Sequence, residues 1–276
     1  MQAQVVTKKK DFDNPYALKV GKRGKGRLDL LDKVYGAFSR DSLKPILKEG
    51  MDIATFGCGT GNLEIWMSSF IGKKGTITAY DISEEQLEIA RLRASALGLK
   101  NIDFVCADIC EIDNTDVFDL VHCRYLLMHL HHPQQAIKKM TSLLKKEGLI
   151  FLEEVSTAAG FSDPKNHSIY KGLSLMNQIS KINRTNYKIG EKLFGLLTQE
   201  YIGDIQIKSY QPLYSVGEEK TSLIESIKEA SESLINKDIV TQAELAKIIA
   251  AMEYFIQDPK TLIGLPISYQ AQGTKI

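Results

Sequence analysis

The sequence predicts an α/β protein whose largely parallel sheet is covered by helices on both faces. Three observations support this fold class. Segments typical of strands and helices alternate five times between about residues 50 and 155. The strand segments are nearly continuous apolar runs, as expected for strands buried on both faces. A length of 276 residues with 43% apolar residues suits one large domain, or one domain with a smaller cap.

The first half of the chain supplies these alternating elements in order. The helical spacing of Leu28, Leu31 and Tyr35 predicts a first helix at about residues 27–38. Strands are then predicted at residues 51–56, 75–82, 101–109, 118–125 and 149–155. The helices between them are predicted at residues 63–70, at 83–98 and within 126–148. Ser83 is the expected N-cap of the second, and Gly98 and Gly148 are expected to close the second and third.

The second half of the chain follows a different pattern. Residues 156–187 are polar with scattered apolar positions and give no clear element. Helices are predicted at residues 190–199, 221–236 and 241–256, and strands at 204–210 and within 262–276. We expect the insertion after the fifth strand and the later helices to form a helical lid over the carboxyl edge of the sheet.

Charge and cysteine content favour a cytoplasmic protein without a membrane span. The net charge is +1, and the basic residues near the N-terminus are interpreted as a solvated segment rather than a binding patch. The four cysteines form no C-x-x-C pair, so we expect reduced thiols. No apolar run has the length of a signal peptide core or of a transmembrane helix.

Three glycines, Gly57, Gly59 and Gly61, lie between the first strand of the alternation and the next helix. Glycines at such a turn allow the backbone to bend tightly and to approach a ligand closely. The dinucleotide fingerprint G-x-G-x-x-G would require glycine at position 62, which is Asn62. The turn therefore indicates a nucleotide-like ligand and argues against a nicotinamide enzyme.

Two acids follow at the ends of the next two strands. Asp81 ends "ITAYD" and Asp108 ends "DFVCAD". The carboxyl ends of neighbouring parallel strands meet at one crevice, where a carboxylate accepts hydrogen bonds from ribose hydroxyls. We expect Asp81 to hold a ribose and Asp108 to accept from an adenine amino group.

At this point the sequence resembles a known family. The segments "ATFGCGTGNL", "AYDISEEQLEIAR", "CADI" and "FDLVHCRYLLMHL" look like successive motifs of the class I S-adenosylmethionine-dependent methyltransferases. The resemblance is close over about residues 50–155 and looser afterwards. It implies a Rossmann-like sheet of seven strands with the last strand antiparallel, S-adenosylmethionine as cofactor and S-adenosylhomocysteine as product.

The resemblance also implies a set of cofactor-binding residues. They are Tyr16, Gly57, Cys58, Gly59, Gly61, Asp81, Ile82, Gln86, Asp108, Ile109 and Arg124. In this assignment the glycine turn lines the methionine part of the cofactor, and Arg124 lies under it. Asp81 binds the ribose, Ile82 packs on the adenine, and Tyr16 covers the cofactor.

The same resemblance implies a division of the chain into three parts. Residues 1–45 are expected to form an N-terminal segment and a helix over the cofactor site. Residues 46–155 are expected to form the cofactor-binding core. Residues 156–276 are expected to supply the lid helices and the last two strands.

Thr55 departs from the family pattern, which usually has Asp or Glu at this position to order the ammonium end of the cofactor. A charged hydrogen bond contributes about 1.5–3 kcal/mol against about 1 kcal/mol for a neutral one, so cofactor affinity is expected to be roughly tenfold lower unless another group compensates. Asp52 is not expected to compensate, because the strand pleat turns it to the opposite face.

The chemistry needs few catalytic side chains, because the cofactor supplies an activated methyl group and the protein supplies position. His129 is the candidate base or acceptor contact, and His122 is expected to be a hydrogen-bonded core residue. No metal site is predicted. Apolar lid material is expected from Phe161, Tyr170, Met176, Tyr187 and Phe194.

The sequence thus predicts a methyltransferase that acts on O, N or C of a small organic molecule, as a monomer or homodimer. The region after the fourth strand is "HCRY" rather than the N/D-P-P-Y/F of many enzymes that methylate amide or base nitrogens. Two alternatives stay open: an RNA methyltransferase, and a non-catalytic partner subunit that binds S-adenosylmethionine.

Overall fold

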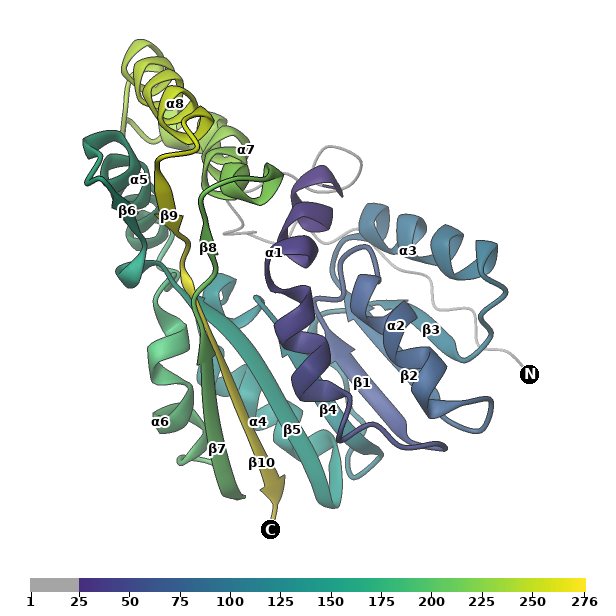
Figure 1. Cartoon of the computed structure of the whole chain (residues 1–276). Coiled ribbons are helices and arrows are strands. Elements are labelled where there is room, and N and C mark those ends of the chain that lie inside the picture. The colour runs from purple at the N-terminus through teal and green to yellow at the C-terminus, as the bar shows by residue number, and fades with distance from the viewer. Residues whose placement is uncertain (1–24) are drawn as a thin grey trace.

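The structure, a computed structural model, describes residues 25–276. A mixed sheet runs through the centre of this part of the chain (Figure 1). Within these residues the sheet has seven strands in the order β3-β2-β1-β4-β5-β10-β7. The strands are β1 (Asp52–Phe56), β2 (Thr76–Asp81), β3 (Ile102–Cys106), β4 (Phe118–Arg124), β5 (Leu144–Ser156), β7 (Ile202–Tyr210) and β10 (Ile267–Lys275). Only β10 is antiparallel to its neighbours β5 and β7, so the predicted fold class is confirmed.

Helices cover both faces of this sheet, as the apolar strands require. Figure 1 shows α1 (Lys25–Leu43), α2 (Asn62–Ile71) and α3 (Glu84–Ala96) on one side. The opposite side carries α4 (Pro133–Leu143) and α6 (Leu193–Leu197). In the central strand β1, Ile53 packs in the cluster under α1 and α2, and its neighbour Ala54 packs in the cluster under α4. Both are 0% exposed.

A lid stands over the carboxyl ends of the parallel strands. It consists of α5 (His167–Ile182), α7 (Ser222–Asn236) and α8 (Gln242–Gln257), which pack on one another at the top of Figure 1. A small sheet in the order β6-β9-β8 joins the lid to the main sheet. Its strands are β6 (Phe161–Asp163), β8 (Leu213–Tyr214) and β9 (Leu262–Gly264).

The buried side chain of Lys220 links two turns of the lid by hydrogen bonds. It is 1% exposed, and its ammonium donates to the Ser215 carbonyl, the Asp258 carbonyl and the Thr261 hydroxyl. These acceptors lie on the turn that follows β8 and on the turn between α8 and β9. The lid is therefore held by specific hydrogen bonds at its attachment as well as by apolar packing between its helices.

Two predictions about elements are wrong. Residues 167–182, for which no element was predicted, form α5, because Ile169, Leu173 and Met176 share one buried face and the Asn166 side chain caps the helix. The helix predicted to close at Gly148 ends at Leu143, because Leu144 already pairs with Phe118 in the parallel ladder.

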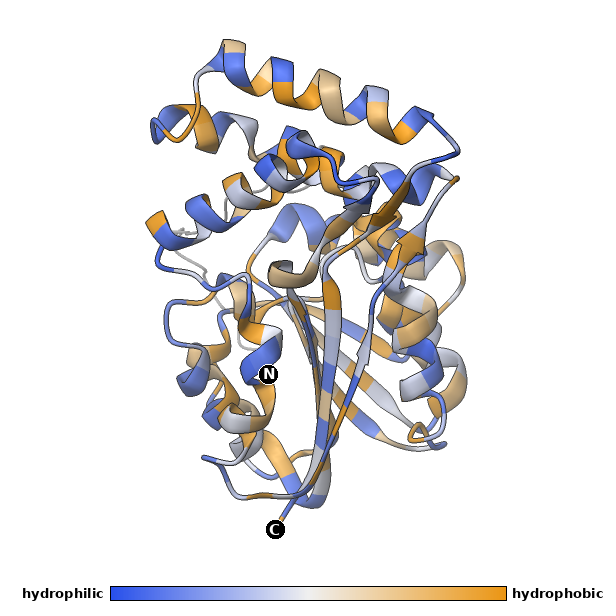
Figure 2. Ribbon diagram, turned by 60° about the vertical axis from the view of Figure 1, so that its left-hand side comes forward, coloured by the Kyte–Doolittle hydropathy of each residue, from blue (hydrophilic) through white to orange (hydrophobic). Residues whose placement is uncertain are grey.

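No helix among residues 25–276 is both long and apolar enough to cross a membrane. Figure 2 shows why for the lid: hydrophobic and hydrophilic residues alternate along its helices, so each helix has one buried and one exposed face. In α8 the buried face includes Leu245, Met252 and Phe255, whereas Tyr254 is 82% exposed.

Candidate functional site

The glycine turn between β1 and α2 has the conformation for which glycine is required. Gly57, Gly59 and Gly61 have φ values of 67°, 54° and 74°, in the left-handed region that other residues rarely adopt. A Cβ on Gly57 would lie 3.3 Å from Leu126, and one on Gly61 would lie 3.1 Å from Ala90. Gly57 and Gly61 therefore let the turn pack closely against the loop after β4 and against α3, and Gly57 and Gly59 line a cavity.

A cavity of about 750 Å³ opens at this turn and extends under the lid. Its walls come from the carboxyl ends of β1, β2 and β4, from α1, and from the start of α7. Ligand sites in proteins commonly have volumes of roughly 300–1,000 Å³, with apolar walls and a few placed polar groups. The cavity has room for a nucleoside-sized cofactor and a second small molecule together.

Asp81 lies at the end of β2 inside this cavity. One carboxylate oxygen accepts from the Gly59 N–H at 2.9 Å, and the other accepts from the Ser83 N–H at 2.8 Å. Burial raises its pKa, and these two N–H groups oppose that shift. Because a carboxylate has further lone pairs, Asp81 is fixed in orientation and still able to accept from ribose hydroxyls.

The predicted adenine-binding residues lie together beside Asp81. Ile82 lines the cavity and is 47% exposed, so an apolar surface is available there for a base. Gln86 and Ile109 are buried in the same wall. Asp108 caps the short turn after β3, accepting from the Cys110 N–H at 2.8 Å, and also faces the cavity.

The structure describes all but one of the predicted cofactor-binding residues. Those that line the cavity are Gly57, Cys58, Gly59, Asp81, Ile82, Gln86, Asp108, Ile109 and Arg124. Gly61 does not line it, because it packs behind the turn against Ala90 and Phe104. Tyr16 lies outside the residues that the structure describes.

Arg124, at the end of β4, lines the cavity and is also bonded to α1. Its guanidinium donates to the Ser39 hydroxyl and to the Asp32 carboxylate, both at 3.1 Å and both on α1. Asp32 also accepts from Arg40, and the two guanidinium groups hold its pKa below the ordinary value in spite of burial. Arg124 therefore fixes α1 to the sheet under the cavity, with its charge already compensated.

A row of buried polar side chains lies beneath α1 and α2. Thr55 on β1 and His122 on β4 are register partners and point to the same face. Glu64, in the first turn of α2, lies beside Thr55. Both ring nitrogens of His122 lack a hydrogen-bond partner among the described residues. The prediction that His122 is buried is confirmed, but the prediction that it is hydrogen-bonded is wrong.

The loop after β4 is organised by Glu154. This buried carboxylate accepts from the N–H groups of Leu126 at 2.8 Å, Leu127 at 2.6 Å and Met128 at 3.3 Å. Burial raises its pKa to about 8, and the three N–H groups oppose the shift. Glu154 thus holds the loop that carries His129 against the cavity.

His129 lines the cavity where it passes from the glycine turn to the lid. Its ring meets Tyr187 edge-on, with 5.4 Å between centroids. Burial and the nearby Arg27 lower its pKa to about 3, so the imidazole is neutral at physiological pH. A neutral imidazole can orient an acceptor molecule through a hydrogen bond, and with so low a pKa it is a weak base.

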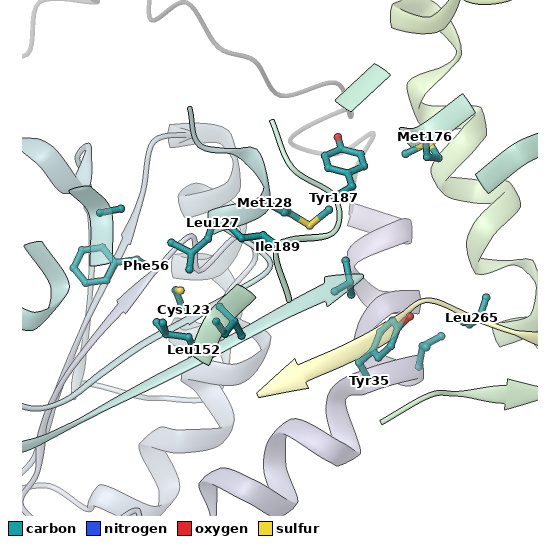
Figure 3. Close-up of a cluster of buried hydrophobic side chains, with 14 of the residues drawn as sticks. Tyr35, Phe56, Cys123, Leu127, Met128, Leu152, Met176, Tyr187, Ile189 and Leu265 are labelled. Atoms are coloured by element: carbon teal, nitrogen blue, oxygen red, sulfur yellow. The ribbon is translucent and has the colours of Figure 1, made fainter. Parts of the chain in front are cut away.

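The lid side of the cavity is mainly apolar. Figure 3 shows Tyr35, Met128, Met176, Tyr187 and Leu265 on separate elements, and all five line the cavity. Met176 and Tyr187 were predicted as lid material, whereas Phe161, Tyr170 and Phe194 do not line the cavity. Ser222 and Ser226, on α7, add hydroxyl groups.

The sequence reasoning missed three residues of the site: Glu64, Glu154 and Arg27. Arg27 pairs with Glu229 of α7 at 2.7 Å and thereby closes α1 against the lid. For Glu64 the sequence shows only an acid in the first turn of a helix, a common placement that the helix dipole favours, so its role was not detectable. Glu154 and Arg27 acquire their roles only through contacts distant in sequence.

Comparison with known sequences identifies a family for this chain. Residues 47–217 match the protein family described as "Methyltransferase domain". The ubiquinone biosynthesis O-methyltransferase of Coxiella burnetii is 35% identical over 114 residues, which are 40% of this chain and 46% of that protein. A probable (S)-tetrahydroprotoberberine N-methyltransferase 2 of Papaver bracteatum is 26% identical over 107 residues, 39% of this chain and 30% of that protein. The chain thus spans less than half the length of these relatives.

Solved structures share the fold over most of the chain. The YcgJ protein of Bacillus subtilis superposes with a TM-score of 0.57 at 16% identity, over 85% of this chain and 96% of that one. The geranyl diphosphate C-methyltransferase of Streptomyces coelicolor gives a TM-score of 0.53 at 13% identity, over 91% of this chain and 83% of that one.

Proposed function

Since the chain belongs to the class I S-adenosylmethionine-dependent methyltransferase family, we propose that its cavity binds S-adenosylmethionine at the glycine turn and a small, mainly apolar acceptor molecule under the lid. The observation that carries the proposal is that one cavity has two chemically different walls. One is the polar edge with Asp81, and the other is the apolar lid wall with Met176 and Tyr187.

The residues of the turn side fit the cofactor chemically. Asp81 is held by two backbone N–H groups with lone pairs left for a ribose, and Ile82 offers an exposed apolar surface beside it. Gln86, 5% exposed, has a side-chain oxygen that finds no hydrogen-bond partner within residues 25–276, and it lines the same wall. When bound, the cofactor supplies an activated methyl group on a sulfonium.

The lid side favours a small organic acceptor over a nucleic acid. Its walls are tyrosine, methionine and leucine side chains, and the hydroxyl groups of Ser222 and Ser226 provide polar contacts. The names of the two curated relatives refer to methylation in ubiquinone biosynthesis and of a tetrahydroprotoberberine, which are both small-molecule reactions. These features support methyl transfer to O, N or C of a molecule of that size.

Positioning is the main contribution of this chain to the reaction. Alignment of an acceptor atom with a methyl donor can contribute about 7–11 kcal/mol to the lowering of a barrier. Glu154 fixes the loop that carries Met128 and His129, and the ion pair of Arg27 with Glu229 joins α1 to α7 beside the cavity. With His129 neutral, the site suits an acceptor atom that is already nucleophilic, such as an amine nitrogen or an ionised phenol oxygen.

The test is calorimetric titration with S-adenosylmethionine, S-adenosylhomocysteine and NAD, followed by turnover assays. Micromolar binding of the first two ligands and no binding of NAD is expected, with affinity lost in Asp81→Ala. Release of S-adenosylhomocysteine is then measured with panels of amines, phenols and a bulk RNA sample. Binding without turnover of any acceptor would favour the non-catalytic alternative, and turnover with RNA alone would contradict the proposed acceptor class.

A further inference from the structure

We propose that Glu64 supplies the carboxylate that binds the ammonium group of S-adenosylmethionine, in place of the acid that related proteins usually carry at the position of Thr55. In this chain the acid has moved from the end of a strand to the first turn of the following helix. The inference rests on the proposed function, because it requires that the cavity binds this cofactor.

The first observation is that Glu64 is buried in the cavity wall without a full set of partners. The residue is 2% exposed and lines the cavity at the glycine turn. Its Oε2 atom has no hydrogen-bond partner among the residues that the structure describes. Buried carboxylates are normally paired or hydrogen-bonded, because removal of a charge from water is costly. A carboxylate left in this state at a ligand cavity indicates a partner on the ligand.

The second observation is that Glu64 lies beside Thr55, where the usual acid is missing. The Thr55 hydroxyl is close enough to favour the ionised carboxyl, although the two groups do not meet in a well-formed hydrogen bond. Thr55 itself is 0% exposed, and its hydroxyl has no other partner in residues 25–276. The two side chains therefore present one combined polar surface, with the charge on α2 and the hydroxyl on β1.

The third observation is that Arg124, the cation that acts on Glu64, is already paired with α1. Arg124 makes no hydrogen bond to Glu64 that the structure shows and acts on it as a charge, while its guanidinium donates to Asp32 and Ser39 of α1. Asp81, on the other side of the turn, adds a second negative charge nearby. His122, the register partner of Thr55, is held neutral by burial. The site thus has a surplus of negative charge that matches a cationic ligand group.

Asp52, the acid closest in sequence to the usual position, cannot take this role. It begins β1 at the opposite end from the glycine turn. Its carboxylate there accepts from the Thr76 hydroxyl at 2.8 Å and from the Lys145 ammonium at 3.4 Å. Glu64 therefore supplies the negative charge that is missing at position 55, and it compensates the loss of cofactor affinity expected from Thr55.

The experiment compares two ligands that differ at the ammonium end. S-adenosylhomocysteine carries the ammonium and carboxylate but no sulfonium, whereas 5′-methylthioadenosine lacks all three. Both are titrated calorimetrically into the wild type, Glu64→Gln, Thr55→Asp and the double variant. Gln is chosen because it has nearly the shape of Glu and lacks the charge. Circular dichroism and thermal unfolding show whether each variant is folded before its affinity is compared.

Glu64→Gln is expected to weaken S-adenosylhomocysteine binding by about tenfold or more, the difference between a charged and a neutral hydrogen bond. Binding of 5′-methylthioadenosine should stay within about twofold of the wild-type value, since it does not reach Glu64. In the double variant, Asp at position 55 restores the carboxylate at the usual place and should recover most of the S-adenosylhomocysteine affinity. Thr55→Asp alone should give no gain, because it places two carboxylates side by side.

Each failure has a distinct meaning. Equal weakening of both ligands by Glu64→Gln would show a purely structural role and overturn the inference. An unchanged affinity for S-adenosylhomocysteine in Glu64→Gln would overturn it as well. If the wild type binds 5′-methylthioadenosine but binds S-adenosylhomocysteine no more tightly, the ammonium site is refuted while the proposed cofactor class survives. If the wild type binds neither ligand, the proposed function itself fails.

Discussion

The turn side and the lid side of the cavity are built in different ways. On the turn side, Gly57, Asp81 and Asp108 come from one stretch of about fifty residues, each from the end of a parallel strand. On the lid side, Tyr35, His129 and Tyr187 come from α1, from the loop after β4 and from the segment after α5. The first surface is set by strand order, and the second by the packing of distant elements.

This difference indicates which part of the function is encoded locally. A parallel sheet brings successive strand ends to one edge, so a short sequence with the right spacing is enough to build a cofactor surface. The lid surface requires α5, α7 and α8 to fold together and to be attached through the small sheet. Substitutions in the two regions should therefore have separable effects, on cofactor affinity and on acceptor binding or folding.

Loss of the carboxylate at position 154 should have the largest effect, because this side chain joins the two regions. Glu154→Ala would leave the N–H groups of Leu126, Leu127 and Met128 without their acceptor inside the protein. Each such loss costs about 1–3 kcal/mol, so the free energy of unfolding should fall by about 3–5 kcal/mol after partial relaxation.

Urea unfolding followed by circular dichroism measures this change. Glu154→Gln is the matched control, because its amide oxygen can still accept from part of the loop, and it should lie between the wild type and Glu154→Ala. A loss below about 1 kcal/mol for Glu154→Ala would show that the loop is held by other contacts.

Substitution at Asp81 tests whether the turn side acts alone. Asp81→Ala removes a carboxylate fixed by the N–H groups of Gly59 and Ser83 and should weaken S-adenosylhomocysteine binding by about 100-fold or more, since two charged hydrogen bonds contribute about 3 kcal/mol at the least. Leu223→Ala, on the lid side, should change the KM of the acceptor and leave cofactor affinity within about twofold. Calorimetry measures cofactor affinity, and steady-state kinetics measure the KM of the acceptor. A large loss of cofactor affinity in Leu223→Ala would show that the two sides of the cavity do not act separately.

The fold and the turn side were predictable because their signals are local. Asp81 and Asp108 could be identified from their position after apolar segments, and Ser83 caps α3 as predicted, with its hydroxyl accepting from the Gln86 N–H. The antiparallel last strand followed from the family resemblance rather than from any pattern in residues 267–275.

The remaining parts depend on contacts that the sequence does not display. The segment of α5 looked polar because only one face, with Ile169 and Leu173, is apolar, and that face meets α7 and α8. The partner of Arg124 on α1, Asp32, lies 92 positions away in the sequence. The importance of Glu64 is visible only once α2 is placed above Thr55.

Glu64→Gln should stabilise the ligand-free protein, which separates a ligand-binding role from a structural one. Burial, opposed by Thr55 and Arg124 and reinforced by Asp81, raises the pKa of Glu64 from 4.5 to about 7. The folded state thus binds a proton more tightly than the unfolded state, so the stability of the wild type falls as the pH rises from 4.5 to 7. Gln has no such dependence.

The variant should therefore match the wild type near pH 5 and exceed its free energy of unfolding by about 1–3 kcal/mol at pH 8. Thermal unfolding without ligand should show this as a rise in Tm of roughly 2–4 °C per kcal/mol. Saturating S-adenosylhomocysteine should reduce or reverse this difference in Tm, because the wild type binds the ligand more tightly and is stabilised more by it. A variant that is less stable at pH 8 would mean that Glu64 holds the turn together.

Substitution at His129 should have the smallest effect, and it tests whether the lid side supplies a base. With its pKa lowered to about 3 by burial and by Arg27, His129 is neutral from pH 5 to pH 8 in the ligand-free protein. The pH profile of kcat/KM should then contain no step between pH 5 and pH 8 that His129→Gln removes. The variant should lose about three- to tenfold in kcat/KM at every pH in this range, the contribution of one neutral hydrogen bond. A step near pH 6–7 that disappears in His129→Gln would instead show that this residue is a general base. The lid side would then take part in proton transfer as well as in binding of the acceptor.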